Sequence, residues 1–220
     1  MRTTIIMARS RGPKTVAVVL GMAILAVGLG ASQDRFEAKP ANKYPAKQAQ
    51  GDVIVAVKPF RTDKDMRAAF DKAEPYKYGF MPMLLVITNN SQHPLNLAGM
   101  KVRYIDGERT GLEPISGEDL AFFNPKGSNK PNTAPLPIPG AVWRRGGKKG
   151  PLAKPEITQR EFKAPVVPPE TSVHGFFYYQ TGNEGDPVSG ASMYISGIQD
   201  MTTSQELFYF EIPLDTYRGK

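Results

Sequence analysis

The hydrophobic pattern along most of the chain is that of β-strands separated by turns. Val53, Val55 and Val57 occupy alternate positions, which places them on one face of an extended segment. An apolar run over 83–87 and the β-prone stretches "TSVHGFFYYQ", "ASMYISGI" and "ELFYFEIPL" continue the pattern. The breaker "NNSQHP" and the "DG" turn at Asp106 and Gly107 separate neighbouring strands. This spacing predicts an all-β fold of the sandwich type.

The last two β-prone stretches are expected to form a hairpin, because the polar link "QDMTTSQ" joins them. Successive side chains of a strand point to opposite faces, so the final stretch divides into two sets. The more apolar set is predicted to face the core, and it consists of Phe208, Phe210 and Ile212.

A helical period interrupts the strand pattern in two places. Apolar residues recur at the spacing of one helix face at Met66, Ala69, Phe70 and Ala73. Asp63 is placed to cap the start of this segment and Pro75 to stop it, which predicts a short accessory helix over 63–74 packed on the sheet. The stretch "SGEDLAFF" predicts a single helical turn capped by Ser116.

The first 31 residues have the pattern of an export signal. Four positive charges precede the uncharged, mostly apolar run "TVAVVLGMAILAVGLG". The span from Thr15 to Ala31 has 17 residues, a length that suits either a cleaved signal peptide or an uncleaved N-terminal helix anchored in the inner membrane. In both cases the charge asymmetry keeps the N-terminus inside, so residues 32–220 are expected in the periplasm or in the medium.

The remainder of the chain is predicted to form one domain behind a flexible tether. Residues 32–50 are rich in Pro, Lys, Gln and Ala and contain few large apolar side chains, which predicts a tether. Residues 51–220 are then the β-sandwich domain. Cysteine is absent, which excludes disulfides and thiol catalysis.

Three stretches resemble segments of small exported bacterial immunoglobulin-like β-sandwich proteins. "VVPPETSVHGFFYYQ" resembles the segment that leads into a late strand of that family, and "FMPMLLVITNNSQHPLNLAGMKVRYID" is similar to its early hairpin. With "MYISGIQDMTTSQELFYFEIPL" the likeness covers about half the chain. Glu170 departs from the family pattern, which has Gly there. The resemblance implies an immunoglobulin-like envelope domain, and it brings no catalytic residues.

Positive charge is concentrated in one irregular region, the Pro- and Gly-rich loop over 124–155. The chain carries a net charge of +7, and no acidic residue occurs between Asp119 and Glu156. Without the four charges of the leader the rest of the chain is +3, so outside this loop the body is −4. The candidate residues for binding an anion or a partner are Lys126, Lys130, Trp143, Arg144, Arg145, Lys148, Lys149 and Lys154.

The expected partner of this loop follows from export. Outside the bacterial cytoplasm the abundant anions are lipid head groups and envelope polymers, so we expect an envelope protein or an anionic envelope component, and no nucleic acid. A merely solvated loop, whose charges keep it soluble, is the simpler alternative.

The chemistry-bearing residues give little support to catalysis. The chain has two histidines, His93 and His174, without metal-ligand spacing, and it lacks the nucleophile-elbow, phosphate-loop and zinc-protease motifs. We therefore predict no cofactor, no metal and no enzymatic activity, with a small hydrolase as the less favoured alternative.

The aromatic run over 176–179 suggests another class of function. Alternate residues face opposite sides, so one pair must lie in the core. If the other pair were exposed, it would form a sugar-binding platform, although cover by the helix or by the long loop is the preferred interpretation. The sequence as a whole predicts a non-catalytic extracytoplasmic binding or scaffolding module, with a carbohydrate-binding module as the alternative.

Overall fold

The computed structural model describes residues 36–123, 149–182 and 185–219. The predicted signal or anchor segment, 1–31, lies outside these residues. Within the described part of the chain, no helix has both the length and the apolar character of a membrane span.

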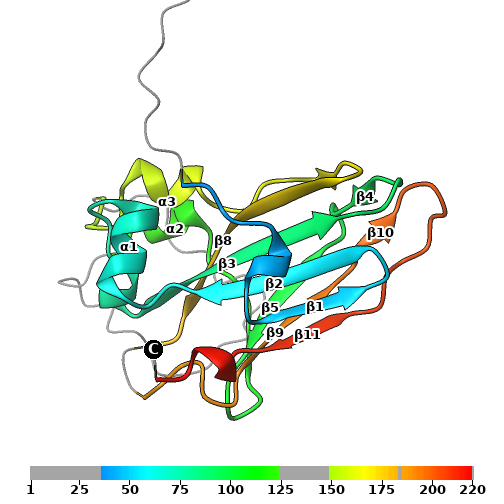
Figure 1. The fold of residues 1–220 in the computed structure, drawn as a ribbon. Coiled ribbons are helices and arrows are strands. Elements are labelled where there is room, and N and C mark those ends of the chain that lie inside the picture. The colour runs from blue at the N-terminus through cyan, green and yellow to red at the C-terminus, as the bar shows by residue number, and fades with distance from the viewer. Residues whose placement is uncertain (1–35, 124–148, 183–184, 220) are drawn as a thin grey trace, which may run out of the picture. The chain divides into compact units, whose positions relative to one another are not determined.

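The described chain is mostly antiparallel β-sheet, as predicted (Figure 1). One four-stranded sheet contains, in spatial order, β1 (Lys47–Gln50), β2 (Val53–Pro59), β3 (Phe80–Asn89) and β8 (Thr171–Gln180). A second four-stranded sheet contains β11 (Phe210–Pro213), β9 (Ser192–Ser196), β5 (Lys101–Ile105) and β6 (Gly111–Leu112). A small third sheet contains β10 (Gln199–Asp200), β4 (Leu95–Asn96) and β7 (Val166–Val167).

Short helices accompany the sheets. The α-helices are α1 (Asp63–Phe70), α2 (Gly117–Leu120) and α3 (Pro155–Gln159). The 3₁₀ helices are η1 (Ala41–Lys43), η2 (Pro75–Tyr78) and η3 (Asp215–Tyr217). Figure 1 shows α1, α2 and α3 gathered at one end of the first sheet, and we call this the helical end.

The main core lies between the two four-stranded sheets, which makes the fold a sandwich. Val53, Val55 and Val57 point into this core from β2, as the alternation predicted. The second sheet contributes alternate apolar residues, among them Tyr104 on β5 and Ile195 on β9. Apolar faces that are buried against one another in this way supply most of the stabilisation of a sandwich.

A second core lies on the other face of the first sheet, under the helices. The side chains of Phe176 and Tyr178 belong to this core, whereas Tyr179 belongs to the core between the sheets. Phe70 of α1 packs on Phe176 with ring centroids 4.8 Å apart. The prediction that the helix covers one face of the aromatic run is therefore confirmed. Phe177 stacks on Phe162 instead, so neither pair forms an open platform.

The edge of β8 near the helical end is also covered. The N–H of Phe162 donates to the carbonyl of Phe176 at 3.0 Å, and the N–H of Phe176 donates to the carbonyl of Arg160 at 2.8 Å. A side chain at Gly175 would collide with the backbone of Phe162, which explains the glycine in the middle of this strand. The cover removes part of an open sheet edge.

The accessory helix differs from the prediction at both ends. Its N-cap is Thr62, whose hydroxyl accepts from the N–H of Asp65 at 3.1 Å, so Asp63 is the first helical residue. The helix ends at Phe70, before the predicted stop, because Asp71 turns the chain with a φ of 51°. Pro75 instead begins η2. The capped turn at Ser116 is confirmed, since its hydroxyl accepts from the N–H of Asp119.

The tether predicted for residues 32–50 is wrong for residues 36–50, which form η1 and β1. Ala41 is fully buried, and its N–H donates to the hydroxyl of Thr88 at 3.0 Å. Phe36 packs on Phe176 with ring centroids 5.3 Å apart. A segment with few large apolar residues can still be ordered, because it packs on a sheet formed by other residues.

The predicted hairpin is present, but the core face of its last strand is only partly correct. Phe210 and Ile212 are buried, whereas Phe208 is 81% exposed. The alternation fails because Gly197, with a φ of 77°, separates β9 from β10. As a result Ile195 and Ile198 both face the core, although they are three residues apart. Residues 207 and 210 pair with them and also turn inward, which leaves Phe208 pointing outward.

Candidate functional site

Two of the predicted basic-loop residues, Lys149 and Lys154, are described by the structure, and both are exposed. Neither forms an ion pair with a described residue. The N–H of Gly150 donates to the carbonyl of Ala121 at 2.8 Å, and Leu152 is fully buried in the core under the helices. The end of the loop is therefore attached at the helical end. The other predicted residues lie outside the described chain: Lys126, Lys130, Trp143, Arg144, Arg145 and Lys148.

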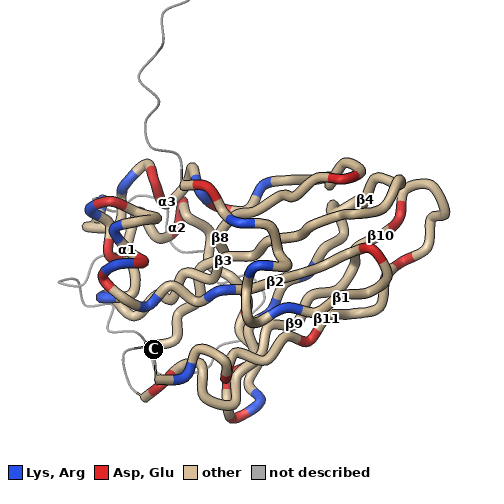
Figure 2. The backbone as a smooth tube through the Cα atoms, viewed as in Figure 1, with Lys and Arg blue, Asp and Glu red and all other residues tan. Residues whose placement is uncertain are grey.

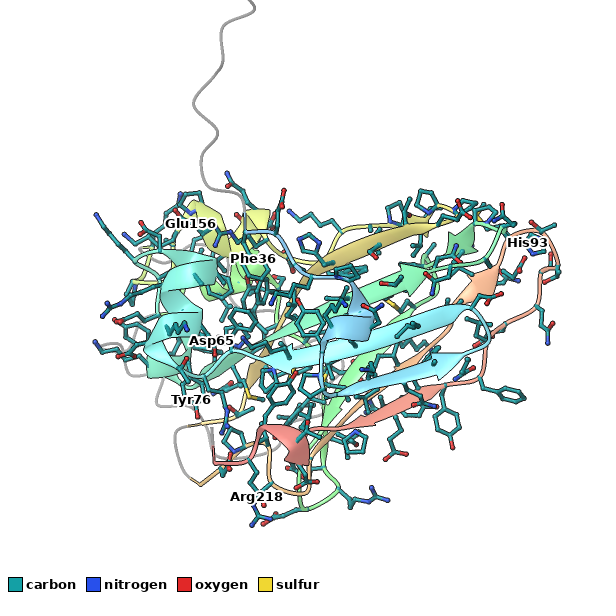
Figure 3. All side chains as sticks on the ribbon, in the orientation of Figure 1. Phe36, Asp65, Tyr76, His93, Glu156 and Arg218 are labelled. Carbon is teal, nitrogen blue, oxygen red and sulfur yellow. The ribbon has the colours of Figure 1, made fainter. Side chains whose placement is uncertain are left out.

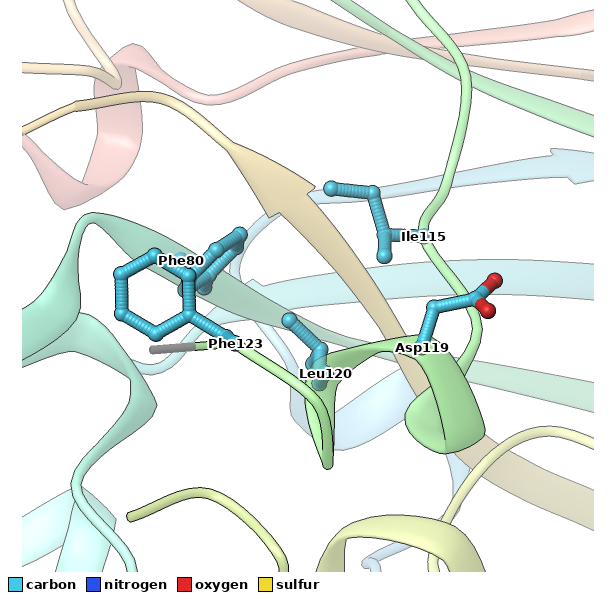
Figure 4. A pocket seen from close by; sticks show the side chains of 5 residues that line it. All are labelled: Phe80, Ile115, Asp119, Leu120 and Phe123. Carbon is cyan, nitrogen blue, oxygen red and sulfur yellow. The ribbon is translucent and has the colours of Figure 1, made fainter. Parts of the chain in front are cut away.

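A small hollow at the helical end is lined by Phe80, Ile115, Asp119, Leu120 and Phe123 (Figure 4). Its volume is about 10 Å³, which is the space of one water molecule. The rings of Phe80 and Phe123 meet edge to face at 4.8 Å beside it. Such a space is a packing gap, and it is too small for an organic ligand.

The acidic groups next to this hollow hold α2 in place. Glu161 accepts from the N–H of Gly117 at 3.2 Å, and Ser116 donates to the carboxylate of Asp119 at 2.7 Å. Burial raises the pKa of Glu161, and the negative charges of Glu118 and Asp119 add to that rise. These carboxylates are accounted for by helix capping and by support of the α2 N-terminus.

A larger cavity of about 390 Å³ lies at the opposite end of the sandwich, and we call it the groove. It is formed by the β1–β2 turn, the β3–β4 turn and the chain around β10, and its lining includes Gln50, Asp52, Gln92, His93, Asp200 and Leu207. In Figure 3, His93 lies at the far end of the sheets from Phe36 and Glu156. Among the described residues no Lys or Arg lines the groove, and Figure 2 shows acidic residues in red near β10.

The β3–β4 side of the groove is organised by a buried amide, Asn89. Its Nδ2 donates to the carbonyls of His93 at 2.7 Å, Val167 at 3.3 Å and Pro168 at 3.2 Å. Its Oδ1 accepts from both the N–H and the hydroxyl of Ser91. The sequence "NNSQHP" predicted a turn here, and the structure shows that one side chain satisfies the turn and joins it to the chain at 167–168.

The His93 ring links this turn to the β10 side. Its Nδ1 lies 2.9 Å from Oδ2 of Asp200. Asp200 Oδ1 accepts from the N–H groups of Thr203 at 2.8 Å and Thr202 at 2.7 Å. The hydrogen bond from Thr203, together with those from His93 and Thr202, lowers the pKa of Asp200 from 3.8 to about 2. Asp200 is therefore an ionised group that holds the two sides of the groove together.

Two exposed aromatic residues directly follow Leu207, which lines the groove, although they are not lining residues themselves, and we call them the ledge: Phe208 and Tyr209. Phe208 is 81% exposed and Tyr209 is 52% exposed, and the only other large hydrophobic residue this open in the described chain is Met201 at 50%. Gln50 Nε2 donates to the carbonyls of both ledge residues, at 3.1 and 2.9 Å. The ring of Tyr209 stacks on Tyr194 with centroids 5.1 Å apart. The ledge is therefore held by defined contacts to β1 and β9.

The groove was not predicted from the sequence as a site. Its residues come from three turns far apart in the chain, and the ledge lies in a stretch whose alternation predicted a core strand. The available signal was the cluster of turn-forming residues around His93 and Asp200.

The described part of the groove lacks the arrangement of a hydrolase or a metal centre. No group of three or more His, Cys, Asp or Glu residues is placed to hold a metal within the described chain. The His93–Asp200 pair would suit a general base and its orienting group. However, the nearby hydroxyl of Ser91 donates to Asn89 at 2.7 Å, so it is not directed at the His93 ring. His174 lies elsewhere, with its ring 6.1 Å from that of Phe36.

Comparison with known proteins adds no relative. No protein-family model matches the chain, and no curated protein and no solved structure is significantly similar to it.

Proposed function

We propose that this protein is an exported, non-catalytic binding module of the bacterial envelope, and that the groove and the ledge form its binding surface. The observation that carries the proposal is the exposure of Phe208 and Tyr209 beside a cavity. Folded domains rarely leave large apolar side chains together in water unless a ligand or a partner covers them. Each other aromatic side chain in the described chain is buried or partly buried.

The location rests on the leader pattern of residues 1–31, which favours delivery outside the cytoplasm. The proposal that the sandwich is immunoglobulin-like is supported by one detail of the backbone. Glu170 has a φ of 54°, in the left-handed region that favours glycine. The resembling family has Gly at this position, so the conformation agrees with the family pattern even though the residue does not.

The absence of catalysis is part of the proposal. The His93–Asp200 pair is used to join two turns, and the Ser91 hydroxyl is used within its own turn. These contacts give both groups a structural role.

The basic loop is proposed as a second contact, with an envelope protein or an anionic envelope component. This proposal is supported by Lys149 and Lys154, because both side chains are exposed and neither has an ion-pair partner among the described residues. Because they are attached at the helical end, this contact would be separate from the groove.

Cell fractionation of bacteria producing the full chain tests the location. We expect the protein in the periplasm, the inner membrane or the medium, and N-terminal sequencing of the mature form will show whether the leader is cleaved. Recovery in the cytosol with residues 1–31 intact would contradict export.

Capture of material from an envelope extract tests the binding surface. The immobilised full chain is compared with the double variant Phe208→Ala/Tyr209→Ala. The control is Lys149→Glu/Lys154→Glu, which also changes two exposed residues but at the helical end. We expect the ledge variant to lose most of the captured material and the lysine variant to keep the groove-dependent part. Equal capture by the wild type and the ledge variant would exclude the groove as the binding surface.

A further inference from the structure

We propose that the groove binds a neutral saccharide, with a sugar ring stacked on Phe208 and its hydroxyls bonded to the turns that line the cavity. This inference rests on the proposed binding function and names the ligand class of that surface. The sugar-binding aromatic face that the sequence suggested at 176–179 is covered on both faces of the strand, so we place it at the ledge instead.

The free hydrogen-bonding capacity of the groove consists mainly of acceptors. Gln50 uses its Nε2 on the ledge carbonyls, and Gln92 uses its Nε2 on Glu170 at 2.8 Å, so each side chain keeps its Oε1 for a ligand. Asp52 is exposed, and its side chain has no hydrogen-bond partner among the described residues, although its backbone carbonyl accepts from the N–H of Asn90, so the Asp52 carboxylate is a third acceptor. A ligand that fits these groups must supply several donors.

The second ring nitrogen of His93 adds a group of variable character. Because Nδ1 is engaged with Asp200, Nε2 is the nitrogen of this groove-lining ring that has no hydrogen-bond partner among the described residues. It accepts a hydrogen bond in the neutral ring and donates one in the charged ring. A ligand hydroxyl can bond to Nε2 of either the neutral or the charged ring, because a hydroxyl both donates and accepts hydrogen bonds.

The charges argue against a basic peptide, which is the other class of ligand rich in donors. Asp200 is also ionised, but its oxygens already accept from Thr202, Thr203 and His93, so Asp52 is the carboxylate that a ligand can reach without displacing these bonds. An ion pair with one exposed carboxylate contributes only about 0–1 kcal/mol and is weakened by salt. Neutral amide acceptors beside an aromatic face offer more to a polyhydroxyl ligand than to a cation.

The dimensions also suit a saccharide. The groove is an open surface hollow of about 390 Å³, so a sugar ring has room there while one side of it stays in solvent. A pyranose ring has one apolar face of C–H groups, which buries well against an open aromatic ring, and a rim of hydroxyls. Phe208 offers such a ring, because the residue is 81% exposed while its backbone carbonyl is held by Gln50.

Calorimetric titration of the full chain with defined probes tests the inference. The probes are chitohexaose, cellohexaose, maltohexaose and mannohexaose, together with a hexa-arginine peptide for the competing class. We expect at least one saccharide to bind with a Kd below about 1 mM. The affinity should change less than about threefold between ~50 and ~500 mM NaCl, because a neutral ligand is not screened.

Two variants separate the ligand classes. Phe208→Ala should weaken the saccharide about tenfold through loss of the stacked face. Asp52→Asn removes the charge but keeps one acceptor oxygen, so it should weaken the saccharide less than Phe208→Ala does, whereas it should remove most binding of hexa-arginine. Because both positions are exposed, neither change should affect folding, which circular dichroism and the melting temperature will check.

The outcomes distinguish this inference from the proposed function. Binding of hexa-arginine that falls with salt and with Asp52→Asn, without saccharide binding, would overturn the saccharide while leaving a binding surface at the groove. Failure of all four saccharides at about 1 mM would also overturn it. If the ledge variant in addition captures as much envelope material as the wild type, then the proposed function itself fails.

Discussion

The two ends of the sandwich use aromatic side chains in opposite ways. At the helical end, the Phe176 ring is fully buried, and the rings of Phe36, Phe60 and Phe70 lie 5.3, 4.9 and 4.8 Å from it. At the groove end, Phe208 is 81% exposed. The chemistry of the residue is the same, so its surroundings decide whether it stabilises the fold or is free to contact a ligand.

This difference guides the search for function. At the helical end α1 packs over the first sheet, and the hollow found there among the described residues has a volume of about 10 Å³. At the groove end no comparable cover is present among the described residues, and a cavity of about 390 Å³ remains. Binding is therefore expected where the sheet turns meet, and stability is expected to depend on the covered end.

Matched truncations of phenylalanine give the largest expected contrast between the ends. Phe176→Ala removes a buried ring and should lower the free energy of unfolding by about 4 kcal/mol. Phe208→Ala should change it by less than about 0.5 kcal/mol. Urea unfolding followed by circular dichroism measures both. Comparable losses would show that the ledge is part of the core in solution.

The carboxylate of Asp200 gives an intermediate effect, which depends on pH. Its pKa is lowered from 3.8 unfolded to about 2 folded, so its contribution to stability is complete above about pH 4 and is lost as the pH falls towards 2. Asp200→Asn should be less stable than the wild type at neutral pH, and the difference should shrink between pH 4 and pH 2. Urea unfolding across this range is the measurement. A difference that does not vary with pH would show that ionised Asp200 does not hold the groove turns.

The backbone at Glu170 gives the smallest expected effect, a gain. Glu170→Gly removes the backbone strain of a non-glycine residue at positive φ, which should stabilise the fold by about 1 kcal/mol. The same change loses the hydrogen bond that Gln92 donates to the Glu170 carboxylate. We expect the free energy of unfolding, measured by thermal unfolding, to rise by about 0.5 kcal/mol. Glu170→Ala is the control, because it loses the hydrogen bond and keeps the backbone conformation. If the alanine variant is at least as stable as the glycine variant, backbone strain is not the cause.

Much of the strand arrangement could be predicted because alternation is a local property. The valines of β2 were found from the period of their side chains, whereas the run in β3 and the whole of β8 were found from their apolar and β-prone composition. The alternation was misleading where a strand is interrupted, as at Gly197. The low content of large apolar residues was misleading in the predicted tether, because Phe36 and Ala41 pack on a sheet formed by other residues. The groove could not be predicted, since its members lie on turns that meet only after the sheets have formed.

The sequence by itself determined most of the extended segments, the places of α1 and α2 and the residue types available for chemistry, because these follow from neighbours a few positions away. Only the tertiary structure decided that Phe176 is covered and Phe208 is open. Cover depends on segments distant in the chain, such as α1 over β8, and on the change of direction at Gly197, and burial by distant residues leaves no period in the sequence.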